Sequence, residues 1–361
     1  MNKSLKMDKE IKKNPIKISR KNSKDKSLSS PTIVVSDDES SSGNFKKKTV
    51  KPKVPARKQV NKDSKVNAKE STNESGVTNK EVPRKKTVKR VSIHESQKSR
   101  NGDGVKPTTK YISSLKGNKQ IVGLTAYDAI MAKLVSKAGV DFILVGDSVG
   151  TTLLGYETTI PVTIDDMIHH TAAVKRGMPD CLVVADLPFG EASFSFDRLL
   201  DSCRRLMQNG ADAVKIEGGK DIADDVEKLV ATGIPVMGHI GLLPQTVKAI
   251  GGYRKFGSEQ EEADSIYTDA MCLEEAGCFA IIAEMLDNKL ADELTKQMLP
   301  PLIGIGSGDN CDGQILVTHD LLGLTPSPLP SFVKPCASLG LDGLNALQKY
   351  VHRIRGSKLK E

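Results

Sequence analysis

After the first 110 residues, short apolar runs alternate along the chain with stretches of helical period. Residues 127–138 repeat apolar side chains at helical spacing, on a face that includes Ile130 and Leu134. Gly139 follows, and the apolar run 142–145 comes next. Glycine just after a helix suits its left-handed cap, and a short apolar run beyond it is typical of a buried strand. The same unit returns after Gly210, Gly233 and Gly277.

Eight apolar runs of this kind predict eight strands. They are residues 121–125, 142–145, 181–186, 211–217, 234–239, 278–284, 301–305 and 314–318. Near-continuous apolar strands that alternate with helices form a parallel sheet covered by helices, so the fold class is α/β. Eight units in roughly 250 residues fit a (β/α)₈ TIM barrel better than an open doubly wound sheet. The chain also lacks a glycine-rich dinucleotide fingerprint after its first strand and lacks a P-loop motif.

Residues 1–106 form a separate N-terminal arm, rich in Lys, Ser, Asn and Asp and with Phe45 as its one aromatic residue. Such a segment buries too little apolar surface to offset its ordering entropy, so we predict a disordered arm before a catalytic barrel domain at 107–361. The basic cluster at 83–90 suits a transport factor. The β-prone run at 32–35, followed by acidic residues, suits edge addition to a ubiquitin-like modifier. A plain solvated, lysine-rich tail is the competing interpretation.

The net charge of +8 hides two unlike parts. Residues 1–110 hold 30 Lys and Arg against 12 Asp and Glu, which leaves 23 against 33 for the rest of the chain. The predicted barrel is therefore acidic, and nucleic-acid binding by it loses its compositional support. Scattered cysteines without a C-x-x-C pair, and the lack of any apolar run of about 18 residues, predict a reduced protein without a membrane span. We expect a cytoplasmic location, with mitochondrial and nuclear locations as alternatives.

Charged side chains stand at the ends of five successive predicted strands. They are Asp147, Asp186, Lys215, Glu217, His239 and Glu284. In a (β/α)₈ barrel these positions converge on the C-terminal face, where active sites are built. One polar residue after a strand is normally a helix cap, but five strands in succession are poorly explained by capping alone. The pattern therefore predicts an active site.

Several carboxylates around one barrel mouth indicate a bound cation. Hard oxygen ligands favour Mg²⁺, and the cysteines and histidines lack the spacing of a zinc site. A metal of this kind can chelate a 2-oxo acid and act as a Lewis acid that stabilises an enolate. A carboxylate that does not bind the metal can then serve as the base, while the lysine neutralises developing charge.

A series of short motifs covers residues 107–340. It includes Thr125-Ala126-Tyr127-Asp128, Gly146-Asp147-Ser148, Ala185-Asp186-Leu187-Pro188-Phe189, Lys215-Ile216-Glu217-Gly218-Gly219, Gly238-His239-Ile240-Gly241, Gly251-Gly252-Tyr253 and Asp312-Gly313-Gln314-Ile315. In order and approximate spacing, these motifs resemble those of the ketopantoate hydroxymethyltransferase family. The resemblance implies transfer of a hydroxymethyl group from 5,10-methylenetetrahydrofolate to 3-methyl-2-oxobutanoate. The product, 2-dehydropantoate, belongs to pantothenate and coenzyme A biosynthesis.

The resemblance also implies roles by position. Asp147 and Asp186 would bind Mg²⁺ and through it the substrate, with Glu217 in or next to the metal shell. Ser148 and Lys215 would hold the oxo acid.

Glu284 would accept the proton from C3, and His239 would lie near the substrate or the folate. A homo-oligomer, commonly a decamer, is implied in the same way. The chain departs from the family pattern after Glu284, where Met285-Leu286-Asp287 replaces the usual Cys-Val-Pro.

Two other functions compete with this interpretation. A lyase or mutase of the phosphoenolpyruvate mutase and isocitrate lyase kind would share the barrel, Mg²⁺ and enolate chemistry, but the Lys-Lys-Cys-Gly-His-type loop of those enzymes is missing. The other alternative is a catalytically inactive barrel that acts as an interaction protein through its basic arm. The intact convergent charges of the strand ends argue against it.

Overall fold

A computed structural model of the chain describes residues 107–177, 179–326 and 328–356. In this part, eight parallel strands pair in sequence order and close into a barrel. The strands are β1 (Ile121–Thr125), β2 (Phe142–Val145), β3 (Leu182–Asp186), β4 (Ala213–Glu217), β5 (Val236–Gly241), β6 (Ala280–Glu284), β7 (Leu302–Ile305) and β8 (Gly313–Leu316). The predicted (β/α)₈ barrel is confirmed, and each strand begins and ends within two residues of its predicted limits. The predictions for the arm lie outside the described residues.

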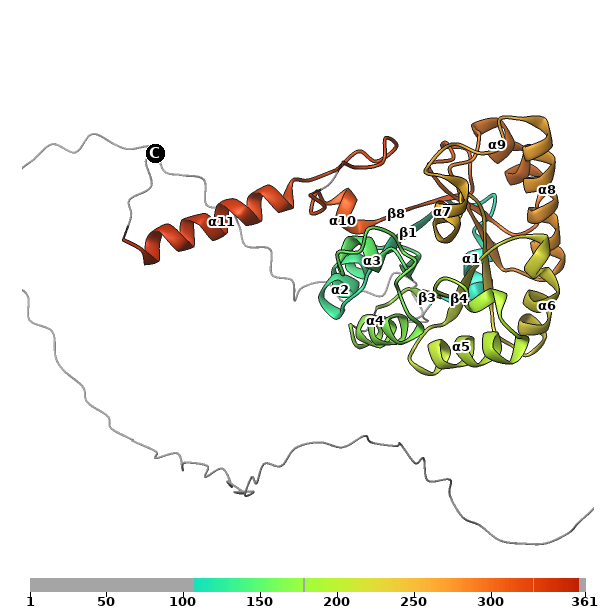
Figure 1. Cartoon of the computed structure of the whole chain (residues 1–361), viewed down its shortest axis with the longest axis horizontal. Coiled ribbons are helices and arrows are strands. Elements are labelled where there is room, and N and C mark those ends of the chain that lie inside the picture. Colours follow the sequence, from blue (N-terminus) through green and yellow to red (C-terminus); the bar gives the residue numbers. More distant parts are fainter. Residues whose placement is uncertain (1–106, 178, 327, 357–361) are drawn as a thin grey trace, which may run out of the picture. The chain divides into compact units, whose positions relative to one another are not determined.

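Helices follow the strands and lie outside them, as Figure 1 shows for α5, α6, α8 and α9. The α-helices are α1 (Thr109–Ser114), α2 (Ala129–Ala138), α3 (Val149–Thr152), α4 (Ile164–Arg176), α5 (Phe196–Gln208), α6 (Ala223–Ala231), α7 (Val247–Ile250), α8 (Gln260–Glu275), α9 (Asn288–Gln297), α10 (Thr318–Leu321) and α11 (Leu339–Ile354). Three 3₁₀ turns join them, η1 (Glu191–Ser193), η2 (Lys220–Ile222) and η3 (Pro244–Thr246). Gly139 ends α2 with φ 93°, the left-handed cap that the sequence predicts.

Two apolar cores lie on the two faces of the barrel sheet. The outer core, between strands and helices, takes one set of alternate strand residues, such as Val183, Val214 and Ile281. The inner core takes the other set, such as Val184, Ala213 and Ile282. Because side chains alternate along a strand, this alternation decides which polar residues enter the barrel mouth.

Helix α1 closes the end of the barrel at which the strands begin. Its Ile112 and the following Leu115 belong to the inner core. The Ser113 hydroxyl donates to the carbonyl of Phe279, just before β6, at 3.0 Å. Lys116 pairs with Asp312, just before β8, at 2.6 Å. The opposite end, where the strands finish, is left for a site.

The prediction that the apolar face of α2 is buried was partly wrong. Ile130 is 84% exposed and Leu134 is 50% exposed, whereas Ala132 and Val135 are buried. Ala132 lies against the end of α4, because a Cβ atom at Gly177 would be 3.0 Å from the Ala132 Cβ atom, and hydrophobicity alone does not indicate such a close contact. Helix α11 likewise carries no buried side chain among its described residues. None of the helices in the described ranges combines the length and apolar character needed to cross a membrane.

We expect Gly123→Ala to lower the free energy of unfolding by about 1–3 kcal/mol, since overpacking a close-packed core forces neighbours to move. Gly123 pairs with Phe142 in the β1–β2 register. A Cβ atom at this position would lie 2.2 Å from Cζ of the buried Phe142 ring. Urea denaturation measures the effect, with the exposed Val122→Ala as a control on the same strand. Equal stability of the two variants would contradict this account of the inner core.

Candidate metal centre and active site

A cavity of about 730 Å³ opens at the end of the barrel where the strands finish. All seven residues that the sequence predicts for the site line it, so the structure brings them together. They are Asp147, Ser148, Asp186, Lys215, Glu217, His239 and Glu284. Most of them continue the inward set of strand positions: Asp186 follows Val184, His239 follows Met237 and Glu284 follows Ile282 at a spacing of two residues. Alternation thus explains why these side chains enter the cavity.

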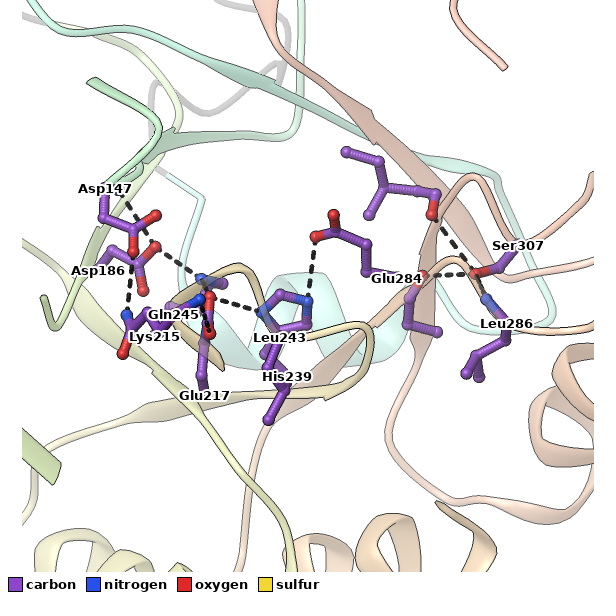
Figure 2. A network of polar contacts seen from close by, with 12 residues as sticks. Asp147, Asp186, Lys215, Glu217, His239, Leu243, Gln245, Glu284, Leu286 and Ser307 are labelled. Atoms are coloured by element: carbon purple, nitrogen blue, oxygen red, sulfur yellow. Dashed lines mark hydrogen bonds and ion pairs between the residues drawn. The ribbon is translucent and has the colours of Figure 1, made fainter. Parts of the chain in front are cut away.

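Three carboxylates form a compact cluster on one side of the cavity (Figure 2). Asp147, Asp186 and Glu217 each offer an oxygen, and these oxygens lie within 4.8 Å of one another. The backbone N–H of Asp147 donates to Asp186 at 3.3 Å, which ties the loop after β2 to the end of β3. Lys215 lies against the cluster, with its Nζ 2.6 Å from Asp186 and 3.6 Å from Glu217.

Gln245 is a site residue that the strand-end pattern missed. Its side-chain amide donates to Asp147 at 3.0 Å and to the carbonyl of Leu187 at 2.8 Å. Its backbone N–H donates to Glu217 at 3.2 Å. One residue of η3 therefore orients two of the three clustered carboxylates. Its place four residues after the end of β5 was the available signal.

The clustered acids resist ionisation in the protein alone. Burial, followed by the neighbouring Glu217, raises the pKa of Asp147 above its ordinary value. Burial and the nearby carboxylates raise the pKa of Asp186 further, against the opposing effect of Lys215. Burial also raises the pKa of Glu217. Burial alone would lower the pKa of Lys215, but the summed attraction of the three acids raises it, so this lysine stays charged.

The cluster fits a hard divalent cation. Oδ1 of Asp186 is buried and has no hydrogen-bond partner in the described part of the chain, although a buried carboxylate oxygen normally has one. Among the described residues that line the cavity, Lys215 is the only Lys or Arg, so one fixed positive charge faces three acids. Carboxylate oxygens are the ligands that Mg²⁺ prefers, and no thiolate lies among them. The donor set is therefore suited to Mg²⁺.

His239 connects this cluster with Glu284. The imidazole places Nδ1 3.4 Å from Glu217 and Nε2 3.3 Å from Glu284, as Figure 2 shows. Burial and then the charge of Lys215 lower the pKa of His239, which favours the neutral ring. Neither ring nitrogen makes a hydrogen bond among the described residues, so the imidazole lies between the two carboxylates without being tied to either.

Ser148 lies in the cavity, whereas Asp287 is not among the described residues that line it. The Ser148 hydroxyl lies in the cavity and is 2.9 Å from the hydroxyl of the buried Tyr127, which fixes its position. Asp287, the acid that replaces the usual proline, accepts from the backbone N–H of Lys289 at 2.9 Å. It caps the start of α9 and is not among the cavity-lining residues, so it is not placed as a base.

Two segments beyond the strand ends add apolar side chains to the cavity wall. Leu153 and Tyr156 come from the segment after α3, and Pro326, Pro328 and Phe332 come from the segment after α10. Polar side chains such as Glu157 line the cavity from the same segments, so this outer wall is largely but not wholly apolar. The cavity thus offers the charged residues of the strand ends and, beside them, apolar side chains from these two segments.

A closed parallel barrel with a deep, acid-lined cavity at its strand ends defines an enzyme of the TIM-barrel class. The family described as ketopantoate hydroxymethyltransferase matches residues 106–359 of this chain. The chain belongs to this family, and it is a hydroxymethyltransferase of pantothenate biosynthesis.

Several relatives are called 3-methyl-2-oxobutanoate hydroxymethyltransferase. The protein from Thermotoga maritima is 48% identical over 68% of this chain and 90% of its own length. The protein from Shouchella clausii is 48% identical over 69% of this chain and 90% of its own length. The protein from Thermosipho africanus is 45% identical over 69% of this chain and 94% of its own length.

One solved structure of similar fold is a more distant relative in sequence. A phosphoenolpyruvate phosphomutase from Streptomyces platensis subsp. rosaceus has a TM-score of 0.48 and 13% identity, over 69% of this chain and 88% of its own. A likeness of this degree does not bear on the activity. The family match and the names of the close relatives favour a transferase over a lyase, a mutase or an inactive barrel.

We expect Asp147→Asn to be at least as stable as the wild type without metal, because it removes one of three crowded, desolvated negative charges. The same change should abolish most of the stabilisation by Mg²⁺, which for a single site amounts to about 2.7 kcal/mol at a hundred times Kd. Thermal unfolding with and without Mg²⁺ measures both effects. Asp141→Asn is the control, because Asp141 is a buried acid paired with Lys119 outside the cavity, and its variant should keep the full Mg²⁺ shift. An unchanged shift in Asp147→Asn would remove Asp147 from the metal site.

Proposed function

We propose that the protein transfers a hydroxymethyl group from 5,10-methylenetetrahydrofolate to 3-methyl-2-oxobutanoate, giving 2-dehydropantoate, with Mg²⁺ as its metal cofactor. The observation that supports this most is the presence, in one cavity, of a buried carboxylate cluster and a separate carboxylate. Asp147, Asp186 and Glu217 make up the cluster, and His239 lies between it and Glu284. The names of the close relatives supply the identity of the oxo acid.

Asp147 and Asp186 would hold Mg²⁺, with Glu217 in or next to its shell. When bound, Mg²⁺ supplies Lewis-acid polarisation of the 2-oxo group, which stabilises the negative charge of an enolate. The ammonium of Lys215 would bind the anionic substrate and neutralise developing charge. The hydroxyl of Ser148, oriented by Tyr127, would donate to the same substrate.

Glu284 would remove the proton from C3 of the oxo acid. It is a cavity carboxylate at a strand end that stands apart from the cluster, and its oxygen lies 3.3 Å from Nε2 of His239. The electron pair left at C3 attacks the methylene carbon of the folate, whose bonds to the two folate nitrogens break in turn. One water supplies the new hydroxyl, and the two folate nitrogens take up the proton removed from C3 and the remaining proton of that water.

The size and polarity of the cavity support a second reactant. Pockets for drug-sized ligands span roughly 300–1,000 Å³, and a five-carbon acid fills only a small part of such a volume. The apolar outer wall, which includes Tyr156 and Phe332, suits a flat heterocycle such as that of a folate. Holding both reactants in one cavity would bring the two carbons into register.

We also propose a homo-oligomer in the cytoplasm. The apolar side chains that α2 and α11 expose, such as Ile130 and Leu347, support association between copies. Scattered cysteines within apolar runs, without a C-x-x-C pair, suit a reducing compartment.

Glu284→Gln should lower the exchange of the C3 proton of 3-methyl-2-oxobutanoate with deuterium oxide by about 10²–10⁴-fold, because it removes a general base but keeps its shape. Proton NMR follows this exchange with Mg²⁺ and without folate, which isolates proton removal from carbon transfer. Binding of the oxo acid should persist, since the clustered acids are intact.

Asp287→Asn is the matched control, because it changes an acid three residues away that caps α9. It should exchange at close to the wild-type rate. If Asp287→Asn lost exchange while Glu284→Gln kept it, the base would be misassigned. A wild-type protein that exchanged no proton at all would refute the proposed chemistry as a whole.

A further inference from the structure

The residue directly after Glu284 has an unusual backbone conformation. Met285 has φ 53° and is the only residue other than glycine with a positive φ in the described part of the chain. A side chain with a Cβ is strained in this left-handed region. Such strain persists only where the surroundings hold it, and it concentrates at functional sites.

Backbone contacts fix Glu284 and Met285 to neighbouring segments. The Met285 N–H donates to the carbonyl of Ile305 at 2.9 Å, and its carbonyl accepts from Phe256 at 2.8 Å. The Glu284 carbonyl accepts from Leu242 N–H at 2.9 Å. The end of β6 is thus joined to β7, to the end of β5 and to the loop before α8.

Ser307 closes this arrangement with a side chain. Its buried hydroxyl accepts from the Leu286 N–H at 2.9 Å and donates to the Ala283 carbonyl at 2.8 Å. These two groups stand on either side of Glu284 and Met285, so one hydroxyl spans the strained turn. Figure 2 shows Ser307 beside Leu286, with Glu284 directed toward His239.

The side-chain contacts of Glu284 restrain it less than its backbone does. Its carboxylate meets His239 at 3.3 Å, longer than a charge-assisted hydrogen bond normally is. The direction of the carboxylate therefore depends on the backbone that carries it.

We infer that Ser307 is a positioning residue for the base: its hydroxyl holds Met285 in the left-handed conformation and so aims Glu284 at the substrate. This inference rests on the proposed function, because it takes Glu284 to be the base. Ser307 is not among the described residues that line the cavity. It acts on the rate of proton removal and leaves binding of the oxo acid to the carboxylate cluster.

Ser307→Ala should lower metal-dependent C3 exchange of 3-methyl-2-oxobutanoate on the order of 10- to 100-fold, the cost of a base displaced by up to about 1 Å. The Kd of the oxo acid with Mg²⁺ should change little. Amide hydrogen exchange at Leu286 should become faster, since its N–H loses its acceptor. This second readout does not depend on activity.

Ser202→Ala is the matched control. It removes another buried serine hydroxyl, one that donates to Glu191 at 2.6 Å on the barrel exterior. Its C3 exchange rate should equal that of the wild type. Thermal unfolding of each variant shows whether it is folded at the assay temperature.

Met285→Gly provides the decisive comparison, because glycine adopts a positive φ without strain. If Ser307 acts by holding Met285, then adding Ser307→Ala to Met285→Gly should cost at least about fivefold less than it costs in the wild type. The Met285→Gly single variant is the reference for this comparison.

Two results would overturn the inference. One is a C3 exchange rate in Ser307→Ala equal to that of the wild type. The other is an equal fold loss of exchange rate when Ser307→Ala is added to the wild type and to Met285→Gly. An equal loss would make Ser307 a general structural residue. Failure of the proposed function looks different. The wild type would then exchange no C3 proton, or Glu284→Gln would exchange normally, while Leu286 still lost its amide protection in Ser307→Ala.

Discussion

Three carboxylates and one ammonium group share a buried site at the end of the barrel, and this imbalance of charge governs the rest of the structure. Removing such charges from water is costly unless they are paired. Lys215 lies 2.6 Å from Asp186, within hydrogen-bond distance, but 3.6 Å from Glu217. The raised pKa values of Asp147, Asp186 and Glu217 express the remaining cost. A divalent cation would offset this imbalance, which is why the donor set suits a metal.

The barrel makes this arrangement possible by fixing strand ends from different parts of the chain around one axis. Parallel pairing sets β4 beside β5, with Glu217 opposite His239, and β5 beside β6, with Gly241 opposite Glu284. The series Asp186, Lys215, Glu217, His239 and Glu284 therefore runs around the mouth in strand order. The imidazole lies between the acids that suit a metal and the acid that suits proton removal. Closure of the barrel keeps the clustered acids and Glu284 at a fixed separation.

The strands and most of the site could be predicted from the sequence, because both follow from local pattern. Apolar runs marked the strands, and the charged residues at their ends, such as Asp186 and Glu284, marked the mouth. Gln245 and Ser307 could not be predicted in this way, since each acts on segments distant in sequence. The positive φ of Met285 was hidden for the same reason, because methionine carries no signal for it. The exposed Ile130 shows that an apolar helical face need not be the buried one.

Turnover by the purified full-length protein tests the central claim most directly. The measurement is formation of 2-dehydropantoate from 3-methyl-2-oxobutanoate and 5,10-methylenetetrahydrofolate, followed by mass spectrometry with Mg²⁺ and after its removal by EDTA. The account predicts product with Mg²⁺, loss of product on chelation and recovery when Mg²⁺ is restored. Product formation that is unaffected by chelation would contradict a metal-dependent site. No product under any metal condition would contradict the proposed reaction.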